Sequence, residues 1–336
     1  MKYGPAGGEE FDTGLDGAEV TGLGLLIANE GNFMYGNASL SYYDPVSQRV
    51  ENEIFARVNG MNLGDVAQSM TFRNGVVWIV VNNSGVIYAV DAATLREKGR
   101  ITGFTSPRCI HFLSDEKAYV TQLWDSRIFI VNPRTRSITG YIDTGMEPGK
   151  GSTEQMVRYD KYVFVTCWSG QSSVLVIDTD TDKVCGRIEV GYQPSSMVID
   201  RYGKIWVMTD GGYDGSENPA LYRIDAATQS IEKRFVFDDG DWVTDLQIDG
   251  AGETLYFINK SVWRMPVTAE SLPAEPFLEY KGTVYYALTV NPVDGEVYVA
   301  DAIDYVQPGR IYRFSPAGEL MDSFTAGISP GAFCWL

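Results

Sequence analysis

The chain is poor in histidine and cysteine and has no long apolar run. Its single histidine, His111, excludes a site built from several imidazoles and lies in a strand-like segment, where we expect a hydrogen-bonded core residue. Four cysteines in 336 residues do not make a disulfide framework. We expect all four to be unpaired, small and buried: Cys109, Cys167, Cys185 and Cys334. No apolar stretch approaches the eighteen or so residues of a membrane-spanning helix.

Basic residues are also few in comparison with acidic ones. The chain has 27 basic and 44 acidic residues, a net charge of −17, so nucleic acid and anionic lipid would be repelled. We therefore expect no nucleic-acid partner and no insertion of the chain into a membrane. The opening residues are rich in glycine and acid without a signal-like apolar region. We interpret residues 1–19 as a flexible lead and residues 20–336 as a single domain.

What the chain does have is a recurring unit of roughly forty to fifty residues. Each unit holds an apolar strand, a polar connection and a second strand that ends in an Asp-x-x-Thr-like turn. Residues 77–82 and 86–94 show it, and residues 204–209 and 220–228 repeat it. Repetition at this period, with strands and no helical pattern, predicts an all-β propeller with four-stranded blades.

Seven units account for the chain. The turns after their second strands fall at Asp44, Asp91, Asn132, Asp178, Asp225, Pro266 and Ser315. Asp or Asn at such a position accepts hydrogen bonds from backbone amides further on, so the turns at Pro266 and Ser315 should be built differently. The first unit lacks an inner strand, whereas residues 330–336 form a spare one. The sequence thus predicts that the C-terminal strand joins the N-terminal blade and closes the ring.

Several strands carry a family resemblance. Residues 118–121, 162–166, 174–181 and 297–300 resemble the repeats of YVTN-type seven-bladed propellers, which include surface-layer-like and YncE-like periplasmic proteins. The resemblance covers roughly residues 20–336. Within that superfamily the chain looks most like secreted propellers of gut Bacteroidetes, some of which are the BtuG lipoproteins that capture vitamin B12.

The resemblance implies a function but no site residue. It implies capture of cobalamin or another corrinoid, handover to an outer-membrane transporter, and a monomer. It also implies a location on the extracellular face of the outer membrane or in the periplasm, with a signal and a lipidated cysteine ahead of residue 1. From the residues alone, a cytoplasmic protein stays equally open.

A candidate site lies where the first strand of each pair ends. Aligning these strands gives one equivalent position in all seven units: Asn29, Asn82, Gln122, Cys167, Thr209, Asn259 and Asp301. Six of these side chains form hydrogen bonds, and they could ring the channel mouth, where propellers bind ligands. Alternatively, such residues are simply preferred where a strand becomes a turn.

Aromatic side chains gather in the loops beyond that ring. Residues 29–39, 209–220 and 301–309 are longer than a hairpin needs, which suggests walls around a pocket. We expect flat aromatic area for a large, partly apolar ligand, although some of these rings should pack between blades. The predicted binding residues, besides the six polar ones above, are Phe33, Tyr35, Trp124, Trp168, Asp210, Tyr213, Trp242, Tyr285 and Tyr305.

The favoured function is non-catalytic capture of a bulky small molecule, and no catalytic residue is assigned. Two alternatives stay open. A sugar-lactone hydrolase could use Asp210 and Asp301 as acid and base or as metal ligands. A protein-docking platform would show a large apolar patch instead. Residues 210–215 offer oxygen donors for Ca²⁺ but lack EF-hand spacing, so we assign no cofactor and no metal site.

Overall fold

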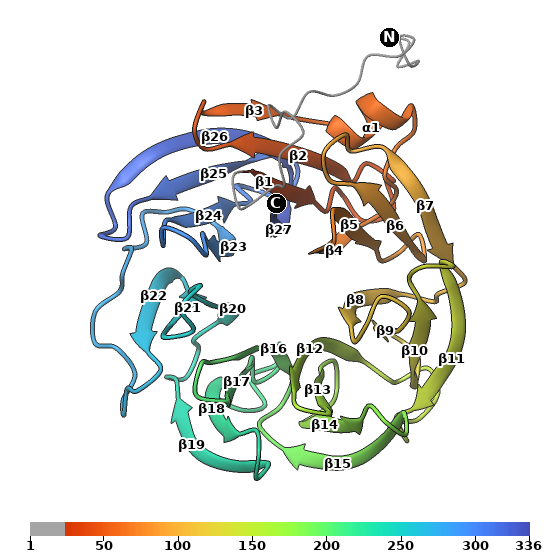
Figure 1. Cartoon of the computed structure of the whole chain (residues 1–336). Coiled ribbons are helices and arrows are strands. Elements are labelled where there is room, and N and C mark those ends of the chain that lie inside the picture. Colours follow the sequence, from red (N-terminus) through yellow and green to blue (C-terminus); the bar gives the residue numbers. More distant parts are fainter. Residues whose placement is uncertain (1–23) are drawn as a thin grey trace.

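A computed structural model describes residues 24–336, which form a ring of seven antiparallel blades (Figure 1). The expected lead over residues 1–19 lies outside the described residues. Blade 1 contains β27 (Pro330–Trp335), β1 (Leu25–Asn29), β2 (Ser39–Asp44) and β3 (Arg49–Glu51), and the short helix α1 (Ile54–Asn59) follows β3. Blade 2 contains β4 (Ala67–Arg73), β5 (Val76–Val81), β6 (Val86–Asp91) and β7 (Glu97–Thr102).

The remaining blades follow in chain order, each from its inner strand outward. Blade 3 contains β8 (Pro107–Phe112), β9 (Ala118–Gln122), β10 (Arg127–Asn132) and β11 (Ser137–Asp143). Blade 4 contains β12 (Thr153–Tyr159), β13 (Tyr162–Cys167), β14 (Ser173–Asp178) and β15 (Lys183–Glu189). Blade 5 contains β16 (Pro194–Ile199), β17 (Lys204–Thr209), β18 (Ala220–Asp225) and β19 (Ser230–Val236). Blade 6 contains β20 (Val243–Ile248), β21 (Thr254–Asn259) and β22 (Ser261–Pro266). Blade 7 contains β23 (Tyr285–Val290), β24 (Val297–Asp301), β25 (Pro308–Phe314) and β26 (Leu320–Ile328).

The predicted seven-bladed propeller is confirmed, with one local variation. In blade 6 the fourth strand is reduced to an isolated bridge between Leu278 and Val262. The turns also behave as the sequence indicates. Asp91 Oδ1 accepts hydrogen bonds from the backbone N–H of Ala93 (3.1 Å) and of Thr94 (3.0 Å). The turn at Ser315 instead relies on a backbone bond from Gly318 N to the Ser315 carbonyl (2.8 Å).

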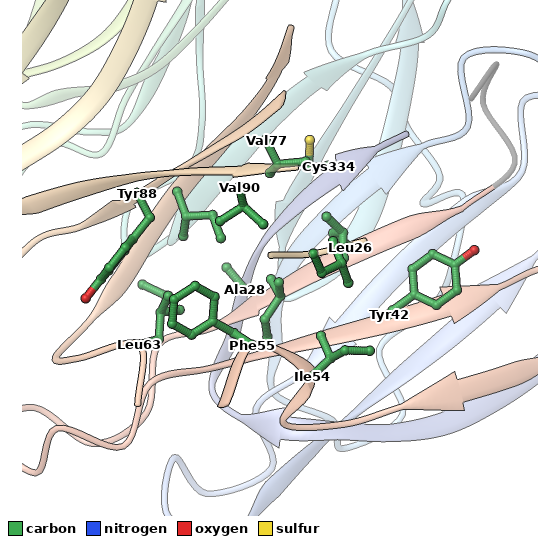
Figure 2. Close-up of a cluster of buried hydrophobic side chains, with 14 of the residues drawn as sticks. Leu26, Ala28, Tyr42, Ile54, Phe55, Leu63, Val77, Tyr88, Val90 and Cys334 are labelled. Atoms are coloured by element: carbon green, nitrogen blue, oxygen red, sulfur yellow. The ribbon is translucent and has the colours of Figure 1, made fainter. Parts of the chain in front are cut away.

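The core lies between the blades. Strands next to the inner one are buried on both faces, whereas outer strands such as β11 and β15 alternate between exposed and partly buried residues. Figure 2 shows one cluster between blades 1 and 2, where Leu26, Phe55, Val90 and Cys334 meet. Cys334 comes from the C-terminal strand, so this cluster depends on closure of the ring.

Ring closure is as predicted. β27 pairs with β1, with Trp335 opposite Leu25, and the Leu336 N–H donates to the Gly24 carbonyl (2.9 Å). Trp335 also reaches blade 7. Its Nε1–H donates to Thr289 Oγ1 (3.1 Å), and its ring lies edge-on to Tyr298 with centroids 5.1 Å apart. One side chain therefore joins the first blade to the last.

Replacing Trp335 with alanine should weaken this closure. We expect Trp335→Ala to lower the free energy of unfolding by about 3 kcal/mol, because an aromatic contact and a hydrogen bond are both lost. Chemical denaturation followed by circular dichroism measures it. The control is Tyr141→Ala, which removes an exposed ring from β11 and should change stability by less than about 0.5 kcal/mol. Equal effects of the two changes would contradict the closing role of Trp335.

The histidine and two cysteines depart from expectation. All four cysteines are free, as predicted, but Cys109 is only partly buried. Cys185 is exposed because it lies on the outward side of the outer strand β15. His111 lies in β8, as the sequence indicates, yet its Nε2 has no hydrogen-bond partner among residues 24–336. Burial lowers the pKa of His111 to about 4, so its imidazole is neutral at physiological pH.

All seven inner strands share an irregularity near their first residues. The register against the next strand shifts there, for instance between Pro107 and Ile110 in β8 and between Pro194 and Ser196 in β16. Such a bulge frees one or two residues from strand pairing and turns their side chains in new directions. The released residues thus lie at the axis of the ring, while the other residues of each inner strand still pack against the neighbouring blades.

The third residue of several inner strands joins neighbouring blades. Ser69 Oγ donates to the Arg108 carbonyl (2.6 Å), and Gln155 Oε1 accepts from Met197 N–H (2.8 Å). Asp245 makes the equivalent contact from blade 6, with Oδ2 accepting from Leu288 N–H. Burial raises the pKa of Asp245 from 3.8 to about 6, despite this bond and one from Gln247.

The raised pKa of Asp245 predicts a pH-dependent stability. Its contribution to folding is fully present below its unfolded pKa and is lost as the pH rises through about 6. From about pH 4 to pH 7, the parent should lose up to about 3 kcal/mol relative to Asp245→Asn, which keeps an acceptor but does not titrate. Urea denaturation across this range measures the difference. The exposed-loop control Asp239→Asn should follow the parent, and parallel curves for all three proteins would refute the prediction.

Candidate ligand-binding site

The second residue of every inner strand lies at the same end of the ring, within or beside the bulge. Seven side-chain positions therefore surround the axis at this end: Gln68, Arg108, Glu154, Ser195, Thr244, Tyr286 and Gly331. We call this set the mouth ring. The loops that leave the strand paired with each inner strand, including those after Cys167 in β13 and Thr209 in β17, begin at the same end.

A charged pair occupies one side of the mouth ring. Arg108 Nε lies 2.7 Å from Glu154 Oε1, and Arg108 Nη1 donates to Gln68 Oε1 (2.6 Å). Both charged side chains are largely buried. Burial opposes the charge of the guanidinium, but the attraction and the hydrogen bond of Glu154 raise the pKa of Arg108 overall. Burial also raises the pKa of Glu154, against the opposing attraction of Arg108. The pair is fixed by its contacts, and it joins three consecutive blades.

Glu30 fills the place of the side chain that Gly331 lacks. A Cβ atom at position 331 would lie 2.3 Å from Glu30 Oε1, so any other residue there would displace this carboxyl group from its present place. Tyr286 Oη donates a hydrogen bond to Glu30 Oε2 (2.9 Å). Burial raises the pKa of Glu30, against the opposing effects of Tyr286 and Arg108. The mouth ring is therefore completed by a residue from the loop after β1.

A cavity of about 150 Å³ opens beside the charged pair. It lies among blades 3 to 6, and its lining includes Arg108, Glu154, Trp168, Ser195, Asp210, Tyr213 and Trp242. Asp210 is fixed from two sides. Its Oδ2 accepts from Trp168 Nε1–H (3.0 Å) and its Oδ1 accepts from Gly212 N–H (2.9 Å). Burial nevertheless raises the pKa of Asp210, because these two bonds only partly offset the loss of solvent.

Aromatic rings form the solvent-exposed wall of this cavity. The centroids of Tyr213 and Trp242 lie 5.1 Å apart, with the ring planes at 39°. These side chains are 72% and 44% exposed, so much of the wall faces solvent. Trp168 is less exposed, with the Arg108 guanidinium 5.7 Å from its ring centroid. A ligand could therefore contact flat apolar area and reach the charged groups that line the same cavity.

The other predicted aromatics lie outside this cavity. Phe33, Tyr35 and Trp124 are exposed on their loops, and Tyr285 is partly buried at the start of β23. Tyr305 packs edge-on against Tyr286, with centroids 5.5 Å apart. The structure thus brings four predicted residues together, and their place in ligand binding stays a prediction: Trp168, Asp210, Tyr213 and Trp242.

The six polar residues at the strand ends make internal hydrogen bonds. Asn29 Nδ2 donates to Ser41 Oγ (2.9 Å) and Asn82 Nδ2 donates to Ser106 Oγ (2.8 Å). The other four also contact backbone or side-chain groups of nearby segments: Gln122, Thr209, Asn259 and Asp301. These contacts match the alternative in which such residues stabilise turns. A role in binding a ligand stays a prediction for them.

Sequence reasoning missed the charged part of the site. Arg108, Glu154 and Ser195 belong to the inner strands, whereas the equivalent polar positions in the sequence belong to the strands that follow. A usable signal existed, because Pro107, Pro194 and Pro330 each begin an inner strand and the next residue is the mouth-ring position. Aligning the inner strands on these prolines would have placed Arg108 and Ser195 at equivalent positions.

A second cavity of about 400 Å³ lies between the inner strands β4, β8 and β12. Its lining is mostly apolar, with Met70, Phe112 and Met156, and includes His111. Within residues 24–336, no three or more His, Cys, Asp or Glu side chains are grouped so that they could hold a metal ion. Over the same residues, no helix has the length and apolar character needed to cross a membrane.

The fold and the mouth define a seven-bladed β-propeller with an aromatic-walled cavity at one end of its axis. The chain belongs to the family described as "Domain of unknown function (DUF5074)", whose model matches residues 23–324. No curated protein matches the chain.

Solved structures share the fold at low identity. A quinonprotein alcohol dehydrogenase-like protein of Bacteroides thetaiotaomicron is 15% identical with a TM-score of 0.72, over 94% of this chain and 78% of that one. The periplasmic gluconolactonase of Pseudomonas aeruginosa is 12% identical with a TM-score of 0.67, over 93% and 98%. The computationally designed Ika8 protein is 14% identical with a TM-score of 0.60, over 91% and 90%. At these identities the likeness shows the fold alone.

Proposed function

We propose that the protein captures a bulky small molecule at the mouth ring without changing it chemically, and that a corrinoid such as cobalamin is the ligand. The observation that carries this proposal is that the exposed rings of Tyr213 and Trp242 form one wall of a cavity whose other walls are charged and polar. Large exposed aromatic side chains beside a few fixed polar groups are typical of small-molecule sites.

The size of the cavity decides how such a ligand would lie. A cavity of about 150 Å³ accommodates a molecule the size of benzene, so only an end group of a corrinoid enters it. The broad apolar face of the corrin would rest on Trp242 and Tyr213, with its peripheral amides toward Arg108, Glu154 and Asp210. The corrinoid itself is suggested by the family resemblance, as are a surface location and handover to an outer-membrane transporter.

Binding is tested by calorimetry with cyanocobalamin on the parent and on Trp242→Ala. We expect the parent to bind and the variant to lose about 2 kcal/mol or more of binding free energy, because a central aromatic contact is removed. The matched control is Tyr202→Ala. Tyr202 is also an exposed aromatic residue but lies in the turn between β16 and β17, at the opposite end of the blades, and its removal should leave affinity unchanged.

Two results would contradict the proposal. Absence of cyanocobalamin binding at micromolar protein would remove the corrinoid as ligand. Hydrolysis of a sugar lactone by the parent, lost in Asp210→Asn, would place the protein among lactone hydrolases instead.

A further inference from the structure

The cavity is lined by more acid than base. Of the lining residues between 24 and 336, Arg108 is the one cationic side chain, and Glu154 and Gln68 already hold that guanidinium. Asp210 lines the same cavity. Within the described part of the chain it accepts hydrogen bonds only from Trp168 and Gly212, and no cation is bonded to it. After the Arg108–Glu154 pair is balanced, the carboxyl group of Asp210 remains as unpaired acid.

Acceptor capacity is also left over. Each oxygen of a carboxylate can accept two hydrogen bonds, whereas each oxygen of Asp210 receives one. Ser195 Oγ is buried in the lining and has no hydrogen-bond partner among residues 24–336. Buried polar groups in native proteins rarely lack partners. The Ser195 hydroxyl can donate or accept, whereas the free lone pairs of Asp210 only accept, so a ligand group that donates to Asp210 would complete the site.

The aromatic side chains of the cavity also favour a ligand group that donates hydrogen bonds or carries positive charge. Aromatic faces carry negative partial charge and attract cations and N–H groups. Trp168 donates its indole N–H to Asp210, and the Arg108 guanidinium lies over its ring. The exposed rings of Tyr213 and Trp242 therefore add to the preference for a donor that the carboxyl group of Asp210 establishes.

We infer that this cavity selects a hydrogen-bond-donating nitrogen group, an ammonium or a primary amide, and rejects a carboxylate of the same shape. The inference rests on the proposed function in that the mouth ring is taken as the ligand site. It goes further by naming the chemistry of the end group. A carboxylate would find the charge of Arg108 already balanced by Glu154, and its oxygens would meet the acceptor oxygens of Asp210 without a proton to share.

Three small molecules of similar size test the selection: benzylamine, benzamide and benzoate, of which the last two also share one shape. Each carries a ring near the size limit of the cavity, and they differ in charge and in donor capacity. Titration is followed by NMR of the indole N–H groups in labelled protein. We expect benzylamine and benzamide to bind at least about tenfold more tightly than benzoate. In Asp210→Asn, which keeps an acceptor for Trp168, the preference for benzylamine over benzoate should shrink several-fold, and the control Tyr202→Ala should leave it unchanged.

Equal affinities, tighter binding of benzoate, or no binding of any of the three at tens of millimolar would overturn the inference. If Asp210→Asn does not fold, the three affinities of the parent protein still decide. The result also separates the inference from the corrinoid proposal. If the protein selects among the three molecules but does not bind cyanocobalamin, the corrinoid is not the ligand and the inference stands. If it binds cyanocobalamin but does not select among the three, the corrinoid proposal stands and the inference is wrong.

Discussion

The register shift at the start of each inner strand is the constraint on which both the ring and its site depend. A strand paired regularly along its whole length would direct every side chain at a neighbouring blade. The bulge releases the second residue toward the axis and aims the third at the next blade, as Arg108 and Asp245 show. Seven repeats of this small defect thus produce a lined opening and a set of contacts that hold the ring together.

Charge at the mouth ring is balanced within the protein rather than by solvent. Arg108 is held by Glu154 and Gln68 from the blades on either side, so its position depends on the packing of three blades. Breaking such a buried pair by removing one partner leaves an uncompensated charge and is strongly destabilising. The same geometry that fixes the site therefore makes its charged residues structural as well.

The repeat predicted most of the fold because blade strands and their turns are local features. Turns at Asp91 and Asp178, and closure by residues 330–336, follow from spacing and turn chemistry alone. The site was harder, since a bulge leaves little trace in a single strand's pattern. Asn29 and Asn82 have the right chemistry for a site but are used for internal bonds, whereas Arg108 resembles an ordinary strand residue. Side-chain direction at the axis is set by non-local packing, which one sequence does not display.

Glu30 occupies the space that a side chain at Gly331 would fill, so the mouth ring is complete only when both ends of the fold are in place. One residue follows the first described strand and the other lies in the last, so the ring of side chains has a gap until the two ends of the fold meet. A ligand held by the complete mouth would therefore bind only the closed ring and would stabilise it by mass action. Occupancy and closure become one coupled equilibrium, in which ligand concentration sets the fraction of molecules whose ends are joined.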